Sequence, residues 1–207
     1  PNLMKELGKI GALGPYIPEE YGGSGLDQIS YGIIMQELER GDSAVRSAAS
    51  VQSSLVMFPI NEYGSEEQKH KYLPHLASGE MIGAFGLTEP NHGSDPSSME
   101  THFEDKGDHY LLNGSKTFIS NGQHADLVVL AVKTDPQARA KGVSLLLVDT
   151  HLDGFKKGTN LEKIGLHSQD TSELFFDNVK VPANQILGEA GKGFAYLMQE
   201  LPRERTS

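Results

Sequence analysis

The spacing of apolar residues changes near residue 81, and this change constrains the fold more than any other feature of the 207-residue chain. Before it, apolar residues such as Leu7, Ile10 and Leu13 recur every three or four positions, which is the spacing of helices. After it, short apolar runs alternate with Gly, Asp and Asn, as in strands separated by turns. The chain is therefore predicted to be an α+β protein, with a helical region followed by an antiparallel β-barrel or sandwich.

The region before residue 80 is predicted to be predominantly helical. Gly14-Pro15 ends the first helical pattern, and Ser65-Glu66-Glu67-Gln68 matches the capping box that opens a helix. Pro59 is expected to kink or end the helix that contains it, because Pro lacks the amide N–H of a helical hydrogen bond. The expected helices are residues 3–13, 27–40, 43–63 and 65–72.

Two details of this region bear on packing and on function. The Gly-rich segment 18–25 is interpreted as a connector, because it contains neither G-x-G-x-x-G nor a Walker lysine. The second helix is expected to have one apolar face, formed by Ile29, Ile33, Ile34 and Leu38.

The β-region is expected to contain a hairpin and several single strands. The hairpin covers residues 110–119, and Asn113-Gly114 is predicted to supply its type I′ turn. After Pro182 the pattern becomes helical again, from Gly193 onward. The other expected strands are residues 127–132, 143–148 and 174–181.

Composition excludes several classes of function. The net charge of −10 argues against nucleic-acid binding, which needs a basic face, and the absence of Cys excludes disulfides and thiolate catalysis. No apolar run approaches the about 20 residues that span a bilayer. The His residues show no metal-ligand spacing, so no metal site is expected. Both ends are expected to be cuts in a longer polypeptide.

The segment 85–95 is the strongest candidate for a binding site. An apolar run leads into Thr88-Glu89-Pro90, and Gly93-Ser94-Asp95 follows two residues later. Pro fixes φ and Gly permits unusual backbone geometry, so the segment is poor material for continuing a strand. It could instead present backbone groups and two hydroxyls to a heterocycle or a phosphate. An ordinary β-turn with a capping Asp is the alternative on these grounds alone.

This order of residues resembles the flavin-binding signature of the acyl-CoA dehydrogenase family. A second element, Lys116-Thr117-Phe118-Ile119-Ser120-Asn121-Gly122, is also similar to that family. The sequence of helices, β-region and new helix agrees with it over nearly the entire chain. The resemblance implies three parts: an N-terminal helical domain (1–82), a middle β-barrel domain that binds flavin and acyl-CoA (83–187), and the start of a C-terminal helical domain (188–207), whose four-helix bundle is missing.

The resemblance also implies FAD as cofactor and assigns residues to it. Thr88 and backbone groups around Leu87 would bond the pyrimidine edge of the ring, and the Ser120 hydroxyl would donate toward N5. Ser94 would meet the thioester-bearing arm of CoA. From pattern alone, Phe118 could instead be a core residue and Ser120 a turn residue. The implied cofactor-binding set is Phe85, Leu87, Thr88, Gly93, Ser94, Phe118, Ile119 and Ser120.

The implied reaction is α,β-dehydrogenation of an acyl-CoA thioester, with hydride transfer to flavin N5. The catalytic base of the family would lie beyond Ser207, so no residue of this chain is assigned as catalytic, and Glu89 is expected to order its own loop. The implied partners are an acyl-CoA substrate and an electron-transferring flavoprotein, within a homotetramer. The location would be cytoplasmic in a bacterium and the mitochondrial matrix in a eukaryote.

The substrate is the least determined point. Segments 37–43, 46–57 and 91–101 are similar to glutaryl-CoA dehydrogenase. This similarity places Arg46 and Ser47 at the distal carboxylate of the substrate, and implies that decarboxylation follows dehydrogenation. Arg46 could instead pair with Asp42 on the helix surface at i,i+4. Segments 164–176 and 193–205 are more similar to long-chain and short-branched-chain acyl-CoA dehydrogenases. A non-catalytic fragment that binds flavin or acyl-CoA, and a flavin monooxygenase or oxidase of the same fold, remain alternatives.

Overall fold

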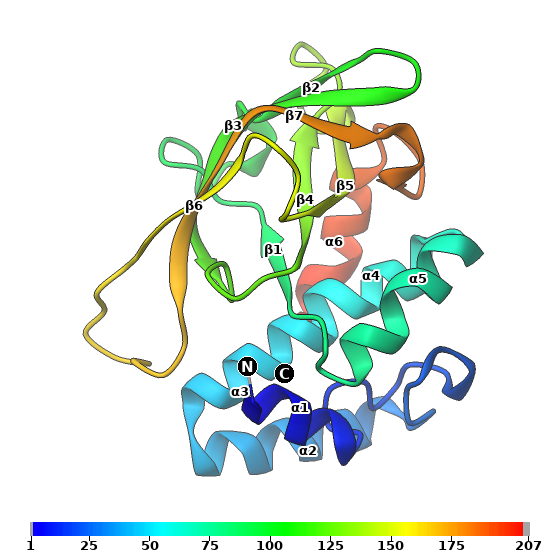
Figure 1. The fold of residues 1–207 in the computed structure, drawn as a ribbon, viewed down its shortest axis with the longest axis vertical. Coiled ribbons are helices and arrows are strands. Elements are labelled where there is room, and N and C mark those ends of the chain that lie inside the picture. The colour runs from blue at the N-terminus through cyan, green and yellow to red at the C-terminus, as the bar shows by residue number, and fades with distance from the viewer. Residues whose placement is uncertain (1, 205–207) are drawn as a thin grey trace.

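The computed structural model describes the backbone of residues 2–204 and the side chains of residues 2–200. The helices of the first 80 residues lie on one side of the molecule and the sheet lies on the other, with the last helix beside the sheet (Figure 1). The end of the segment 193–205, on which part of the sequence similarity rests, falls outside the described residues. No helix among the described residues is long and apolar enough to cross a membrane.

Polar side chains cap helices of this region. Asp27 accepts a hydrogen bond from the backbone N–H of Ser30 at the start of α2. The capping box is confirmed, because Ser65 and Gln68 each bond the backbone N–H of the other. The helix that it opens continues five residues past the predicted end at residue 72. The helices of this region are α1 (Asn2–Lys9), α2 (Gln28–Gly41), α3 (Ser43–Ser50), a π-helix (Val51–Met57), α4 (Phe58–Tyr63) and α5 (Glu66–Ala77), with a 3₁₀ turn at Glu19–Tyr21.

Pro59 does not end the helix, which continues to Tyr63. The predicted helix 43–63 consists of three successive segments, and Pro59 lies in the first turn of the last one, α4. Because the helical run is continuous, the missing N–H of Pro59 removes one backbone hydrogen bond just after the π-helix changes to an α-helix. Immediately before it, the Phe58 N–H bonds the Ser53 carbonyl, five residues back, as in a π-helix.

The expected apolar face of α2 is partly wrong. Ile29 is 74% exposed and Ile33 is 56% exposed, whereas Tyr31 and Met35 are buried. Both pairs have helical spacing, so the sequence offered two apolar stripes. Packing against α3 buried the second stripe, where the Tyr31 hydroxyl donates to Ser50.

The strands form one mostly antiparallel sheet. Its order is β6-β7-β3-β2-β4-β5-β8, and β1 pairs in parallel with β4. No ladder joins β6 to β8 within residues 2–204, so closure into a barrel stays a prediction. Helix α6 (Gly193–Glu204) follows the last strand. The strands are β1 (Gly83–Gly86), β2 (His102–Asp105), β3 (His109–Ser120), β4 (Leu127–Lys133), β5 (Val143–Asp149), β6 (Phe155–Asn160), β7 (Thr171–Pro182) and β8 (Ile186–Leu187).

The predicted hairpin turn at Asn113-Gly114 is wrong. Both residues lie inside β3, where Asn113 pairs with His102 of β2. The actual turn lies just before β3, where the Lys106 N–H bonds the His109 carbonyl at 2.9 Å. Gly114 has φ 140° and sits at a register shift, and a Cβ there would lie 2.7 Å from the Thr101 Cα. The Asn-Gly pair therefore marks a bulge with close backbone approach rather than a turn.

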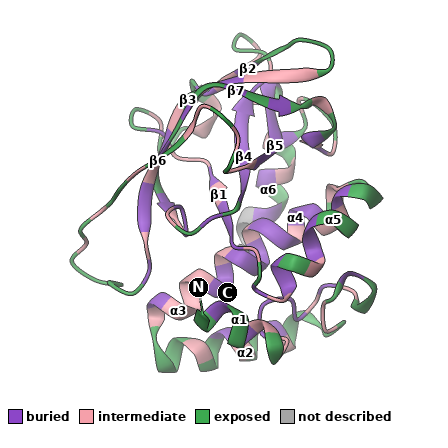
Figure 2. Cartoon of the chain, in the orientation of Figure 1, coloured by how far each residue is buried: buried purple, intermediate pink, exposed green. Residues whose placement is uncertain are grey.

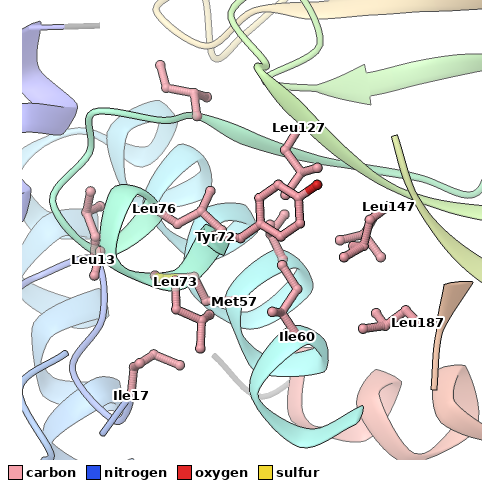
Figure 3. Packing of buried hydrophobic residues seen from close by; sticks show 14 of the residues in the cluster. Leu13, Ile17, Met57, Ile60, Tyr72, Leu73, Leu76, Leu127, Leu147 and Leu187 are labelled. Carbon is pink, nitrogen blue, oxygen red and sulfur yellow. The ribbon is translucent and has the colours of Figure 1, made fainter. Parts of the chain in front are cut away.

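The central strand β4 is buried on both faces (Figure 2). Alternate residues such as Leu127 join the helical core beside Tyr72 and Leu76, together with Leu147 of β5 (Figure 3). The residues between them, such as Val128, face the second core within the sheet region. Each fully buried aliphatic side chain contributes about 1.5–3 kcal/mol, so this shared strand fixes the helices onto the sheet.

The same junction brings the π-helix against β1. A Cβ at Gly83 would lie 2.5 Å from the Val56 Cγ1, so only glycine allows the two backbones to approach this closely. Asn121 reinforces the junction, since its buried amide donates to the carbonyls of Ala48 and Gly83, both at 3.2 Å. The candidate site is built at this contact.

Candidate functional site

A pocket of about 210 Å³ opens where the π-helix, β1 and the end of β3 meet. The pocket brings together three segments of the chain that lie at least 30 positions apart in the sequence. Its lining includes most of the predicted cofactor-binding set. The lining residues are Val51, Leu55, Phe85, Leu87, Thr88, Phe118, Ile119 and Ser120.

Two of these lining residues were not identified from the sequence. Two other residues, which were assigned to the cofactor, lie outside the pocket. Val51 and Leu55 come from the π-helix, and their i,i+4 spacing was the only indication that they share a face. Gly93 and Ser94 do not line the pocket; they are exposed on the loop that follows Glu89.

Phe118 projects into the pocket because the strand is irregular there. Its φ is +57°, and it lies at a register shift between Lys116 and Ile119 relative to β7. A bulge re-aims side chains, and a non-glycine residue at positive φ costs about 1–3 kcal/mol. The ring is 66% exposed while both sequence neighbours are buried, so the core interpretation of Phe118 is wrong.

The polar groups of the pocket are two hydroxyls. Thr88 and Ser120 are half-buried, and within the described residues neither hydroxyl forms a side-chain hydrogen bond. The carbonyl oxygens of the same stretch are already engaged: Leu87 O accepts from Lys116 Nζ at 3.0 Å, and Thr88 O accepts from the Thr117 N–H at 2.8 Å. The pocket thus offers an aromatic face, aliphatic walls and free hydroxyls, which suits the polar edge of a flat heterocycle.

Below the pocket lies a buried ion pair that the sequence did not reveal. Lys116 Nζ is 2.9 Å from Glu89 Oε1, and the two side chains are 0% and 4% exposed. Burial lowers the pKa of Lys116 to about 8, and the Glu89 charge partly offsets that fall.

Glu89 orders its own loop, as predicted. Its carboxylate accepts the backbone N–H of Glu100 at 2.6 Å and of Thr101 at 3.0 Å. Burial alone would raise the pKa of Glu89, but the Lys116 charge and these hydrogen bonds outweigh burial and hold it below the usual range.

Arg46 already has a partner within the chain. Its Nε donates to Glu39 Oε2 at 2.7 Å, and the Arg46 side chain is 28% exposed. Pairing with Asp42 is not observed; Asp42 instead caps α3 by accepting from the Ala44 and Val45 N–H groups. Arg46 does not line the pocket, and its role toward a substrate stays a prediction.

Ser47 also contacts another part of the chain. Its hydroxyl accepts from the Gln169 Nε2 at 2.9 Å, which ties α3 to the loop before β7. Asp42 makes a similar contact with Ser168, at 3.1 Å.

In the part of the chain that the structure describes, no group of three His, Asp or Glu residues could hold a metal ion.

Two family models match the chain. The acyl-CoA dehydrogenase N-terminal domain matches residues 1–80, and the acyl-CoA dehydrogenase middle domain matches residues 84–179. The chain belongs to the acyl-CoA dehydrogenase family. The resemblance inferred from the two sequence motifs is therefore confirmed.

Relatives within the family are named after different substrates. A glutaryl-CoA dehydrogenase of Desulfococcus multivorans is 44% identical over 99% of this chain and 53% of its own length. The mitochondrial long-chain specific acyl-CoA dehydrogenase of Sus scrofa is 45% identical over 98% of this chain and 47% of its own length. The chain thus spans about half the length of these curated relatives.

A solved relative bears on the cofactor. The structure of a glutaryl-CoA dehydrogenase from Mycobacterium smegmatis in complex with FADH2 matches with a TM-score of 0.91 and 43% identity, over 99% of this chain and 51% of that one. The pocket residues fit such a group, because an exposed aromatic ring and two free hydroxyls line one open cavity.

Proposed function

We propose that this chain is the FAD- and acyl-CoA-binding part of an acyl-CoA dehydrogenase that oxidises a thioester between Cα and Cβ. The single observation that carries the proposal is Phe118, an exposed aromatic ring held at positive φ over a pocket with two free hydroxyls. When bound in this pocket, FAD would supply the acceptor for the hydride that leaves the substrate Cβ.

The chain's own residues bind and orient the ring. Phe85, Leu87 and Phe118 would contact its faces, and Thr88 would bond the pyrimidine edge. Ser120, at the end of β3 beside Ile119, would donate toward N5 and stabilise charge that develops on the reduced ring.

The loop after β1 would contact the CoA part of the substrate. Gly93 and Ser94 lie exposed on this loop, and Ser94 would contact the thioester-bearing arm of CoA. The proton at Cα would be taken by a carboxylate beyond Ser207, on the four-helix bundle that follows the β-barrel domain in the family.

For the substrate, we favour glutaryl-CoA with subsequent loss of CO₂. Arg46 and Ser47 would meet the distal carboxylate, and guanidinium groups bind carboxylates in two-pronged geometry. Glu39, which pairs with Arg46 in this structure, would hold the Arg46 guanidinium near the substrate carboxylate. A long- or branched-chain acyl group is the second candidate, because an Arg46 already neutralised by Glu39 would tolerate an apolar neighbour.

A non-catalytic fragment that binds flavin or acyl-CoA is the alternative of another class. For the active enzyme, we further propose an electron-transferring flavoprotein as electron acceptor and assembly as a homotetramer. The location would be the cytoplasm of a bacterium or the mitochondrial matrix of a eukaryote.

The test is a steady-state assay of the full-length protein with FAD and a dye acceptor. We would compare glutaryl-CoA with butyryl-, octanoyl- and palmitoyl-CoA, in the wild type and in Arg46→Ala. The matched control is Arg40→Ala, which removes an exposed arginine that pairs with Glu37 on α2.

A preference for glutaryl-CoA that Arg46→Ala abolishes and Arg40→Ala leaves intact would support the carboxylate clamp. A preference for longer neutral chains, equal in all three proteins, would favour the second candidate. FAD binding without turnover of any of the four thioesters would favour the non-catalytic alternative.

A further inference from the structure

The buried pair Lys116–Glu89 has no role in the function proposed above. It joins β3 to the loop after β1, the two elements that carry most of the pocket lining. Removing two charges from water is expensive, and apolar residues of similar volume often stabilise a core as well or better. Fold stability alone is therefore a weak explanation for an ion pair at this position.

The lysine acts directly on the backbone of the pocket. Besides Glu89, its ammonium donates to the Leu87 carbonyl at 3.0 Å, and the next residue of β3, Thr117, donates its N–H to the Thr88 carbonyl at 2.8 Å. Both carbonyls are thus engaged within the protein. The side-chain hydroxyl of Thr88 is left as a polar group for a ligand.

The glutamate fixes the other end of the same stretch. Its two carboxylate oxygens accept from consecutive backbone N–H groups, at Glu100 and Thr101. The loop between residues 90 and 99 is therefore closed at its base by one side chain, and this loop carries the exposed Gly93 and Ser94.

Building on the proposed function, we propose that Lys116 and Glu89 are positioning residues, which hold Leu87, Thr88 and the 89–101 loop in their ligand-bound arrangement before FAD binds. Neither side chain lines the pocket, so both act through the backbone that they bond. A preformed site binds more tightly, because its ordering occurs during folding and not during binding.

The decisive variant is the double substitution Lys116→Met with Glu89→Gln in the full-length protein. It removes both charges at similar volume and leaves no unpaired buried charge. We expect it to fold, to raise the FAD dissociation constant at least tenfold, and to shift the visible absorption band of bound flavin.

The matched control is Lys133→Met. Lys133 is another buried lysine, 3% exposed on β4, and it donates to the Arg139 carbonyl at 2.6 Å, away from the pocket. We expect FAD affinity within twofold of wild type in this variant, whatever its melting temperature. A folded double variant that also binds FAD within twofold of wild type, with an unchanged flavin spectrum, would overturn the proposal.

A measurement without substitutions covers the case in which the double variant does not fold. In the wild-type apoprotein, we expect the amides of Glu100, Thr101 and Thr117 to be protected from hydrogen exchange before FAD is added. Exchange at the rate of an unfolded chain, with protection only after FAD is added, would overturn the proposal. A folded wild-type protein that binds no FAD would instead contradict the proposed function, so the two failures are distinguishable.

Discussion

The pocket beside Phe118 and the region around Arg46 on α3 differ in how deeply their ion pairs are buried. Behind the pocket, Lys116 and Glu89 are almost completely buried, and they bond backbone groups of Leu87, which lines the pocket, and of Glu100. On α3, Arg46 is partly exposed and pairs with one side chain, Glu39. The pocket is therefore braced by buried groups of the fold itself, whereas Arg46 is held by a single partly exposed ion pair. Under the proposed function, this difference means that FAD binding should tolerate few changes around Lys116 and Glu89, whereas the fold should tolerate changes at Arg46.

The largest expected effect comes from breaking the buried pair on one side only. Lys116→Met should lower the free energy of unfolding by about 3–5 kcal/mol, because it leaves the Glu89 carboxylate buried without its counter-charge. Thermal and urea unfolding measure the loss. The control is Lys106→Met, which removes an exposed lysine paired with Glu104 and should change stability by about 0–1 kcal/mol. Equal losses in the two variants would show that the pocket is not specially fixed.

The next prediction is a change that weakens FAD binding without lowering the stability of the fold. Phe118→Ala should weaken FAD binding by roughly tenfold, or about 1.4 kcal/mol, since the ring is a wall of the pocket. It should leave stability nearly unchanged, because the ring is 66% exposed. Isothermal titration and thermal melting measure the two quantities. Phe175→Ala removes another exposed aromatic ring, on β7 and outside the pocket lining, and should alter neither.

The buried carboxylate of Glu89 should make the stability of the protein depend on pH. The pKa of Glu89 is held below its ordinary value of 4.5, so its carboxylate stabilises the folded state above that value. This stabilisation is lost as pH falls through the lowered pKa, because the unfolded chain then binds the proton more readily. Unfolding midpoints measured between pH 6 and 3 should fall less steeply in Glu89→Gln than in the wild type. Parallel curves would assign the acid sensitivity to other carboxylates.

The smallest expected effect is on the Arg46 side. Arg46→Ala should change the free energy of unfolding by about 0–1 kcal/mol, as expected for a single partly exposed ion pair. Chemical denaturation against Arg40→Ala measures the difference. A loss above 2 kcal/mol would mean that Arg46 is structural, and the contrast between the two regions would disappear.

The sequence predicted much of the site because motif residues are close in the chain. Phe85, Leu87 and Thr88 lie on one strand end, and Phe118 to Ser120 lie on another, so two motifs named most of the lining. It could not predict that Gly93 and Ser94 lie outside the pocket, or that Val51 and Leu55 line it. The positions of Val51 and Leu55 depend on how the π-helix approaches β1 at Gly83.

By itself, the sequence determined the class of fold, the family and the capping box that opens α5. Apolar spacing, the Ser65 capping box and the two motifs are local properties, which need no knowledge of distant neighbours. Only the tertiary structure decided which stripe of α2 is buried, that Asn113-Gly114 forms a bulge, and that Lys116 meets Glu89. Each of these depends on a partner far along the chain, and the free energy of packing against that partner exceeded the local preference.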